Sequence, residues 1–204
     1  YLSFNMNNPE MQDVRVRQAV NYAINKQGIV DRILRGYGKP AYGMLNAGTY
    51  AYDPNFVSYQ YDPDKARALL AEAGYADGLD LYFDVMIYGT GELTEKWIQR
   101  DLKKVGINLI INKMEWLAYL DKWVPGMTDD VHMNEMIWGE QLPRWTAFGY
   151  RCDRVPPDGN NIGWYCNADM DDLFQLALET ADESKRAALY QQADSWIMMN
   201  DPAN

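Results

Sequence analysis

The sequence predicts an α/β domain in which helices flank a mixed sheet. Strand-like and helix-like segments alternate over residues 79–138, as they do when crossover helices connect buried strands. Several helical segments also have a capping residue at the start, an apolar face and a glycine at the end. With 204 residues, the chain is long enough to bury a substantial core, and we expect residues 1–204 to form a single domain.

The first part of the chain predicts one strand and three helices, together with an irregular segment. The strand is expected at 1–5, and the helices at 13–25, 26–36 and 61–75. Asp13 and Asp62 are placed to cap two of these helices, because a carboxylate can accept a hydrogen bond from a free N–H of the first turn. Residues 37–60 are rich in Gly, Pro and Tyr and lack helical period, and long irregular segments of this kind are often functional.

The rest of the chain predicts three more strands and four more helices. The strands are expected at 79–88, 107–114 and 132–138, and the helices at 92–106, 115–124, 169–181 and 183–200. The only histidine of the sequence, His132, falls in the last of these strands. Because a catalytic triad or a site with several histidine ligands cannot be built from one histidine, we expect no metal and no cofactor.

The two cysteines, Cys152 and Cys166, flank a loop that is rich in Pro, Gly and Asn. A disulfide closing a loop of this length stabilises a fold by roughly 3 kcal/mol in the chain-entropy model. The alternative is two unrelated buried thiols. We favour the disulfide, because little else in the sequence could hold the loop, and it indicates an oxidising compartment.

Composition excludes several classes of protein. The formal net charge of -10 argues against nucleic-acid binding, which needs a basic surface. No stretch of about 18 apolar residues is available to span a membrane. The 15 Tyr and 7 Trp are numerous, and such side chains fill cores but also line binding sites. The chain starts in a strand without a signal peptide, so we expect a piece of a longer protein with any export signal upstream.

Carboxylate pairs are the remaining candidates for catalysis. Glu135, Glu140 and Asp153 lie close in sequence to two tryptophans, as in some glycoside hydrolases. That mechanism depends on the separation of the two carboxylates, which the sequence does not determine. Acidic residues are common in a chain that has 29 of them, so we expect no enzyme activity and retain a glycoside hydrolase as an alternative.

Several blocks of the sequence resemble the family 5 extracellular solute-binding proteins of ABC importers, which include dipeptide- and oligopeptide-binding proteins. These blocks are, in order, YLSFNMNNPEMQDVRVRQAVNYAINKQGIV, YDPDKARALLAEAGYADG, LKKVGINLIINKMEWLAYL and YQQADSWIMMNDPA. The two cysteines also fall where members of the family have them. The resemblance covers nearly the whole chain.

The resemblance implies a periplasmic-binding-protein-like lobe of type II. Residues 1–204 would form most of lobe II, and the other lobe would be absent from this chain. The whole protein would close over a solute in the cleft between its lobes and deliver it to a membrane ABC permease. We therefore expect a periplasmic or extracytoplasmic monomer with a small-molecule or peptide ligand, and any lipid anchor would lie upstream. Nickel and haem binding also occur in the family, but a single histidine favours neither.

The loop WGEQLPRW, residues 138–145, is where the family would place ligand contacts. Dipeptide binders have an aspartate just before a proline in this loop, which holds the α-amino group, and an arginine after the strand that matches 79–88. This chain has Leu142 before Pro143, and no basic residue in the stretch 88–93. Both charged groups of that clamp are missing, unless Glu140 replaces the aspartate.

The remaining candidates for ligand contact are aromatic, amide and loop residues. They are Trp138, Gly139, Glu140, Gln141, Leu142, Trp145, Trp116 and Tyr88. For each tryptophan, packing in the core is about as good an explanation as contact with a ligand. The family favours a peptide ligand, whereas the missing charges favour an oligosaccharide or another neutral solute. A sensor that passes its loaded state to a receptor is a further alternative.

Overall fold

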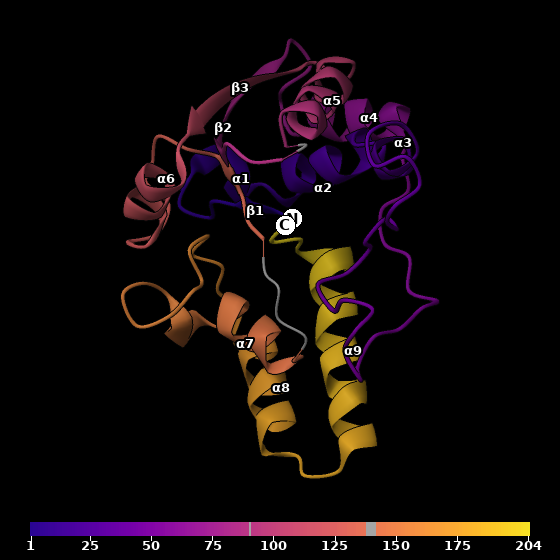
Figure 1. The fold of residues 1–204 in the computed structure, drawn as a ribbon, viewed down its shortest axis with the longest axis vertical. Coiled ribbons are helices and arrows are strands. Elements are labelled where there is room, and N and C mark those ends of the chain that lie inside the picture. Colours follow the sequence, from indigo (N-terminus) through magenta and orange to yellow (C-terminus); the bar gives the residue numbers. More distant parts are fainter. Residues whose placement is uncertain (90, 138–141) are drawn as a thin grey trace.

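The structure has two parts, an α/β layer and a group of helices below it (Figure 1). It is a computed structural model that describes residues 1–89, 91–137 and 142–204. The two ends of the chain lie beside each other where the parts meet, and the N–H of Phe4 donates to the carbonyl of Ala203 (3.0 Å). None of the helices in these ranges has the length and apolarity that a membrane crossing requires.

The sheet has four strands in the order β1-β4-β2-β3, among the residues that the structure describes. The strands are β1 (Leu2–Phe4), β2 (Leu79–Met86), β3 (Ile107–Met114) and β4 (Met133–Glu135). β2 pairs in parallel with both β3 and β4, and β1 pairs antiparallel with β4. Phe83 of β2 lies opposite Ile111 of β3 and Met133 of β4. The predicted mixed sheet flanked by helices is therefore confirmed.

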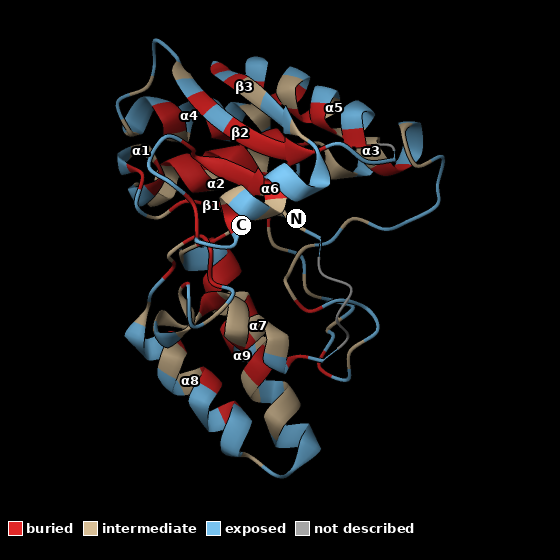
Figure 2. Ribbon diagram, turned by 60° about the vertical axis from the view of Figure 1, so that its left-hand side comes forward, coloured by how far each residue is buried: buried red, intermediate tan, exposed pale blue. Residues whose placement is uncertain are grey.

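One face of the sheet packs against three helices, α2 (Val14–Ala23), α4 (Pro63–Glu72) and α5 (Gly91–Lys103). Alternate residues of a strand point to the same face, which explains why one set of β2 residues enters this core. The set consists of Leu81, Phe83 and Val85, all fully buried. From the helices, the core receives Val16, Ala19, Val20, Ala66, Leu70, Ile98 and Leu102. Figure 2 shows the buried residues concentrated in this layer.

The other face of the sheet is covered by α6 (Trp116–Trp123) and nearby loop residues. Asp84 of β2 points to this face and is buried, with its carboxylate 2.6 Å from Nζ of Lys122. It also accepts a hydrogen bond from the side chain of Asn112 in β3 (3.0 Å). The apolar residues that pack here are Met86, Tyr119, Trp123, Met127, Val131 and Ile162.

Helix capping follows the prediction in the first half of the chain. The side chain of Asp13 accepts a hydrogen bond from the N–H of Arg15, and that of Asp62 accepts one from Lys65. α3 (Lys26–Arg32) is shorter than the predicted 26–36. Short α1 (Pro9–Gln12) was not predicted. Residues 37–60 contain neither helix nor strand, as the sequence predicted.

The lower part consists of α7 (Arg144–Tyr150), α8 (Ala168–Glu179) and α9 (Glu183–Asn200). Their shared core contains Ala147, Tyr150, Met170, Phe174, Tyr190, Ala193 and Ile197. The sequence did not predict α7, because seven residues with a glycine and three aromatic side chains give a weak helical signal.

The strand expected at 132–138 is shorter than predicted, since β4 runs only from Met133 to Glu135.

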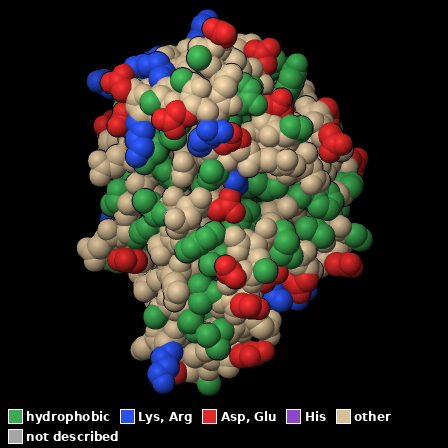
Figure 3. All heavy atoms as spheres, turned by 180° about the vertical axis from the view of Figure 1, so that it is seen from behind, with side chains coloured by type: hydrophobic (Ala, Val, Ile, Leu, Met, Phe, Trp, Pro, Cys, Tyr) green, Lys and Arg blue, Asp and Glu red, His purple; other side chains and the backbone are tan. Residues whose placement is uncertain are grey.

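Arg17 connects the two parts. This residue of α2 is only 4% exposed, and its guanidinium lies 2.5 Å from the carboxylate of Asp201. It also donates to the carbonyl of Pro202 (3.2 Å). A buried arginine needs such partners, because an ionised group without them is costly to remove from water. Seen from behind, apolar side chains are numerous across the middle of the molecule, where the two parts meet (Figure 3).

The predicted disulfide between Cys152 and Cys166 is present in the structure. It joins the short 3-10 helix Cys152–Arg154 to the segment that precedes α8. Buried Asn161 also holds this loop, since its side-chain amide donates to the carbonyls of Arg151 (2.9 Å) and Tyr165 (2.6 Å). The loop is therefore held by a covalent bond and by a buried hydrogen-bonding side chain.

Replacing both cysteines by serine should lower the free energy of unfolding by about 3 kcal/mol, because the unfolded chain regains the freedom of the closed loop. The cysteines are 14 residues apart, which sets this magnitude. Urea denaturation of the wild type and of the double variant measures the difference. A reducing agent should destabilise the wild type alone. A loss much smaller than this would show that Asn161 suffices to hold the loop.

Candidate ligand-binding site

The topology of the sheet brings two loops together at one edge. From β2 the chain passes through α5 to β3 on one side, and then through α6 to β4 on the other side. The segments that follow β2 and β4 therefore leave the same edge of the sheet in neighbouring positions. In open α/β sheets, ligands bind at the carboxyl ends of strands where the connections diverge in this way. This edge is our candidate site.

Tyr88 and Glu135 meet at this edge. Tyr88 follows β2, and its hydroxyl donates a hydrogen bond to Oε1 of Glu135, the last residue of β4 (2.8 Å). Oε2 of Glu135 is buried, and no donor in the described part of the chain reaches it. Burial raises the pKa of Glu135, and the hydrogen bond from Tyr88 and the nearby N-terminal ammonium of Tyr1 partly offset this. The group can therefore accept a further hydrogen bond from a ligand.

A second carboxylate, Glu95 of α5, lies near this pair. Its side chain is almost fully buried, and its Oε2 lies 3.7 Å from Nζ of Lys113. Burial raises the pKa of Glu95, and the negative charge of Glu135 raises it further. The ring of Tyr88 and the carboxylate of Glu95 both approach Gly91, at the start of α5. Two carboxylates with raised pKa values make this edge favourable for a group that donates hydrogen bonds or carries positive charge.

The predicted residues Leu142 and Trp145 line a cavity of about 350 Å³ beside this edge. Met136 and Ile137, which follow β4, form part of the same wall. Trp145 belongs to α7 and packs edge-on against Phe148, with ring centroids 5.4 Å apart. The structure thus places two predicted residues from one loop around the same hollow.

The other predicted residues have different outcomes. Tyr88 is at the candidate edge, as described above. Trp116 is 52% exposed at the start of α6 and stacks against Tyr119, with 6.5 Å between ring centroids. It does not line the cavity of Leu142 and Trp145. Trp138, Gly139, Glu140 and Gln141 lie outside the described residues.

The alternative carboxylate pair is not supported by the position of Asp153. Its two oxygens accept hydrogen bonds from the guanidinium of Arg151 (2.9 and 3.1 Å), next to the disulfide. Glu140 belongs to the stretch that the structure does not describe. Sequence reasoning considered Glu135 only as a hydrolase carboxylate and did not expect its contact with Tyr88. The available signal was its place at the end of a strand, on the edge where ligands bind.

His132 has a structural environment. Its Nδ1 accepts a hydrogen bond from the N–H of Tyr82 (3.1 Å), and the two rings stack with centroids 5.6 Å apart. Burial lowers the pKa of His132, although the nearby carboxylate of Glu10 opposes this. No group of three or more potential metal ligands occurs within the described ranges.

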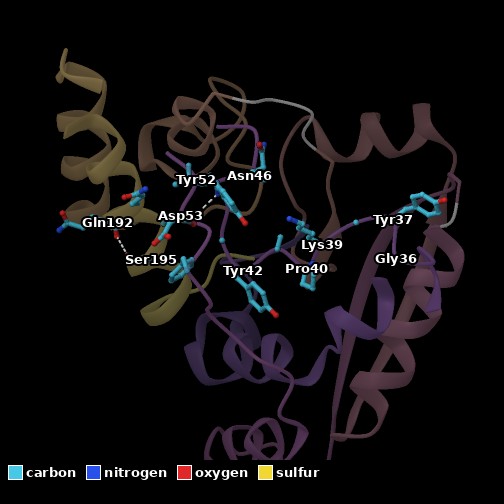
Figure 4. Close-up of a pocket in the computed structure, with 18 residues that line it drawn as sticks. Gly36, Tyr37, Lys39, Pro40, Tyr42, Asn46, Tyr52, Asp53, Gln192 and Ser195 are labelled. Atoms are coloured by element: carbon cyan, nitrogen blue, oxygen red, sulfur yellow. Dashed lines mark hydrogen bonds between the residues drawn. The ribbon is translucent and has the colours of Figure 1, made fainter. Parts of the chain in front are cut away.

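Another cavity, of about 950 Å³, lies between the irregular segment 36–56 and α9 (Figure 4). Most of its lining residues belong to this segment, and they include three tyrosines, Tyr37, Tyr42 and Tyr52. Asp194 of α9 is buried there, and its carboxylate accepts hydrogen bonds from the N–H groups of Met44 (2.7 Å) and Leu45 (3.5 Å). A Cβ at Gly43 would lie 2.3 Å from Oδ2 of Asp194. Asp194 therefore fixes the segment to α9, and only glycine fits beside it.

Comparison with known proteins places the chain in a family. Residues 1–147 match the family model described as bacterial extracellular solute-binding proteins, family 5 middle. The chain belongs to this family. This confirms the resemblance seen in the sequence.

Several of the similar curated proteins are peptide-binding proteins by name, and others are named heme-binding or glutathione-binding proteins. The chain is 32% identical to Di/tripeptide-binding protein 1 of Pseudomonas aeruginosa, over 95% of this chain and 36% of that protein. It is also 32% identical to the dipeptide-binding protein of Escherichia coli, over 100% of this chain and 38% of that protein. The chain thus spans well under half the length of these relatives.

Solved structures show the same fold. The periplasmic binding protein DppA from Helicobacter pylori, in complex with the peptide STSA, has a TM-score of 0.86 and 26% identity, over 97% of this chain and 39% of that one. HbpA2 from Haemophilus parasuis has a TM-score of 0.88 and 27% identity, over 99% of this chain and 40% of that one. The fold is the type II periplasmic-binding-protein fold, as the resemblance implied.

Replacing Asp194 by Asn should remove a pH dependence of stability. Burial raises the pKa of Asp194 to about 6, from 3.8. Asp194 therefore loses its proton at a lower pH in the unfolded chain than in the folded protein. Its contribution to stability is greatest at low pH and is lost as the pH rises through about 6. The free energy of unfolding of the wild type, relative to that of Asp194→Asn, should fall by about 2 kcal/mol between pH 4 and pH 7. Urea denaturation across this range tests it, and a constant difference would contradict it.

Replacing Tyr88 by Phe should raise the pKa of Glu135 further. The hydroxyl of Tyr88 stabilises the ionised carboxylate, and phenylalanine cannot donate that hydrogen bond. A carbon-13 NMR titration of labelled glutamate side chains measures the change. Tyr82→Phe serves as a matched control, because Tyr82 is exposed and stacks on His132. A pKa of Glu135 that stays the same or falls in Tyr88→Phe would contradict this assignment.

Proposed function

We propose that the chain forms most of lobe II of a two-lobed extracytoplasmic binding protein that delivers a peptide-class solute to a membrane ABC permease. Membership of the solute-binding family supports this proposal. So do the names of the similar proteins, which bind dipeptides and tripeptides. The chain covers 36% and 38% of those two relatives, which leaves ample length for a second lobe.

The observation that carries the choice of ligand is the hydrogen-bonded pair of Tyr88 and Glu135 at the edge of the sheet. A carboxylate with one buried oxygen without a donor fits the ammonium or N–H groups of a peptide. The apolar cavity of Leu142 and Trp145 lies next to it and suits a side chain. A sugar would use the face of Trp145 but would leave Glu135 with neutral hydroxyl donors only.

The contacts with the ligand follow from this arrangement. We assign them to Tyr88, Glu135, Leu142 and Trp145, and from the sequence alone we add residues 138–141. Trp116 is exposed on α6, where it is available to a ligand that extends beyond the edge or to the second lobe. We assign the protein no cofactor and no catalytic role. In this reading it is a monomer outside the cytoplasm, and any lipid anchor precedes this chain.

Native mass spectrometry of the full-length protein, purified without refolding, tests the proposed function. We expect masses of retained peptides. A ladder spaced by one hexose would contradict the peptide proposal and support oligosaccharide binding on the same scaffold. Turnover of a glycoside would support the hydrolase alternative.

Trp145→Ala in the full-length protein should weaken peptide binding by about tenfold or more, because the cavity wall loses a large apolar face. Trp116→Ala is the matched comparison, since it removes the exposed tryptophan of α6. Isothermal titration calorimetry measures both affinities, and thermal unfolding verifies that the variants are folded. An unchanged affinity in Trp145→Ala would exclude this wall from the site.

A further inference from the structure

Half of one face of the sheet is exposed to solvent. Alternate residues of a strand share a face, so Asp80, Tyr82, Asp84 and Met86 of β2 point to the side of α6. Asp84 and Met86 are buried beneath α6 and its neighbouring loop. Asp80, in contrast, is exposed, and Tyr82 is 45% exposed. α6 therefore covers only the second half of β2.

β3 widens this exposed area. Asn108 lies opposite Asp80 and is exposed, and Ile110 lies opposite Tyr82 and is half-buried. The side-chain amide of Asn108 donates a hydrogen bond to Oδ1 of Asp80 (3.0 Å). Parallel strands are normally covered on both faces, because their crossover helices lie on each side. We call these four residues, Asp80, Tyr82, Asn108 and Ile110, the open sheet face.

Two carboxylates at the open sheet face have no cationic partner. Asp80 forms no ion pair with a lysine or arginine in the described part of the chain, and neither does Glu10, which borders the face. Glu10 lies 3.6 Å from Nε2 of His132, whose ring stacks on Tyr82. Burial lowers the pKa of His132 and thus favours its neutral form, so the imidazole leaves the charge of Glu10 uncompensated.

A third carboxylate, Asp130, lies in the loop after α6, and its side chain is 72% exposed. Its neighbour Lys122 lies 3.6 Å from it but only 2.6 Å from buried Asp84. The hydrogen bond from Thr128 lowers the pKa of Asp130, so this group is ionised at neutral pH. The positive charge of Lys122 therefore faces two negative charges, and the border of the open sheet face is acidic.

The open sheet face is separate from the candidate ligand-binding site. It lies on the first half of β2, whereas Tyr88 lies beyond the end of β2 and Glu135 lies at the end of β4. Its residues line neither of the two cavities described above. A contact there would leave the candidate site open to its own ligand.

We propose that the open sheet face binds a basic segment of a partner protein, with an arginine of that segment over Tyr82 and paired with Asp80. A guanidinium group fits both contacts, because it stacks flat on an aromatic ring and presents N–H groups that match a carboxylate. Ile110 is placed to contact the apolar stem of the arginine. Glu10 and Asp130 add attraction for neighbouring cations of the segment. This inference goes beyond the proposed function and does not depend on the ligand of the candidate site.

The charge of the face argues against other occupants. A neutral partner would leave Asp80 and Glu10 without a counter-charge, and an acidic partner would be repelled. A second copy of this chain presents the same carboxylates, and its formal net charge is -10. A basic segment is the partner that satisfies both the carboxylates and the ring.

Fluorescence anisotropy with the full-length protein tests this proposal. The probe is a labelled octapeptide of alternating glycine and arginine, with both ends blocked so that no charged terminus contributes. We expect it to bind more tightly than the corresponding lysine peptide and to lose affinity as salt is added. The corresponding glutamine and glutamate peptides should not bind. An arginine peptide that does not bind, or a glutamine peptide that binds as tightly, would overturn the proposal.

Variants of the face locate the contact. Tyr82→Ala should weaken binding of the arginine peptide by about tenfold, whereas Tyr82→Phe, which keeps the ring, should not weaken it. Asp80→Asn should weaken binding by about threefold or more and reduce its dependence on salt. Thermal unfolding verifies that each variant is folded. Unchanged affinity in both Tyr82→Ala and Asp80→Asn would show that the peptide binds elsewhere.

Tyr52→Ala and Asp172→Asn are the matched controls, because they remove an exposed tyrosine and an exposed aspartate outside the face. Both should bind the arginine peptide as the wild type does. If Asp172→Asn weakens binding as much as Asp80→Asn, the peptide responds only to the net charge and the assigned site is wrong.

Two further measurements test the other occupants. Binding of cellopentaose that depends on Tyr82, without binding of the arginine peptide, would assign the face to neutral sugars and overturn the proposal. Self-association of the wild type in sedimentation velocity, abolished in Tyr82→Ala, would assign the face to a second copy instead. We expect neither result.

Discussion

Hydrogen bonding of β2 to a parallel strand on each side is the constraint on which the rest of the structure depends. Parallel neighbours require crossover connections, and α5 and α6 provide them on opposite faces of the sheet. The second half of β2 is consequently buried on both faces, so its carboxylate at Asp84 needs Lys122 of α6 as a partner. The same arrangement brings the ends of β2 and β4 together, where Tyr88 can reach Glu135. The packing of β2, the ion pair of Asp84 with Lys122 and the candidate site thus all follow from the central position of β2 in the sheet.

The helical part is joined to this layer by charged groups as well as by apolar contact. Arg17 of α2 binds the turn after α9, and Asp194 of α9 binds the irregular segment. These two residues therefore link α9 to α2 and to the irregular segment. The irregular segment can therefore lack helix and strand and still form defined walls, because its backbone N–H groups at 44 and 45 have a buried acceptor.

Sequence patterns predicted the long elements well and the short ones poorly. The predicted 107–114 and 183–200 agree with Ile107–Met114 and Glu183–Asn200, because long periodic segments carry a strong signal. α7 is short and rich in aromatic residues, and β4 is limited by its three-residue pairing with β1, which no local pattern shows. The site was predicted in part. Tyr88, Leu142 and Trp145 border the edge, whereas the contact between Tyr88 and Glu135 was missed, because it depends on the pairing of β2 with β4.

The position of Glu135 has a consequence for binding. Glu135 belongs to β4, where it pairs with Leu2, and its carbonyl accepts a hydrogen bond from the hydroxyl of Tyr119. Groups that are ordered before the ligand arrives lose less conformational entropy when it binds. The sheet therefore holds Glu135 in place before a ligand binds.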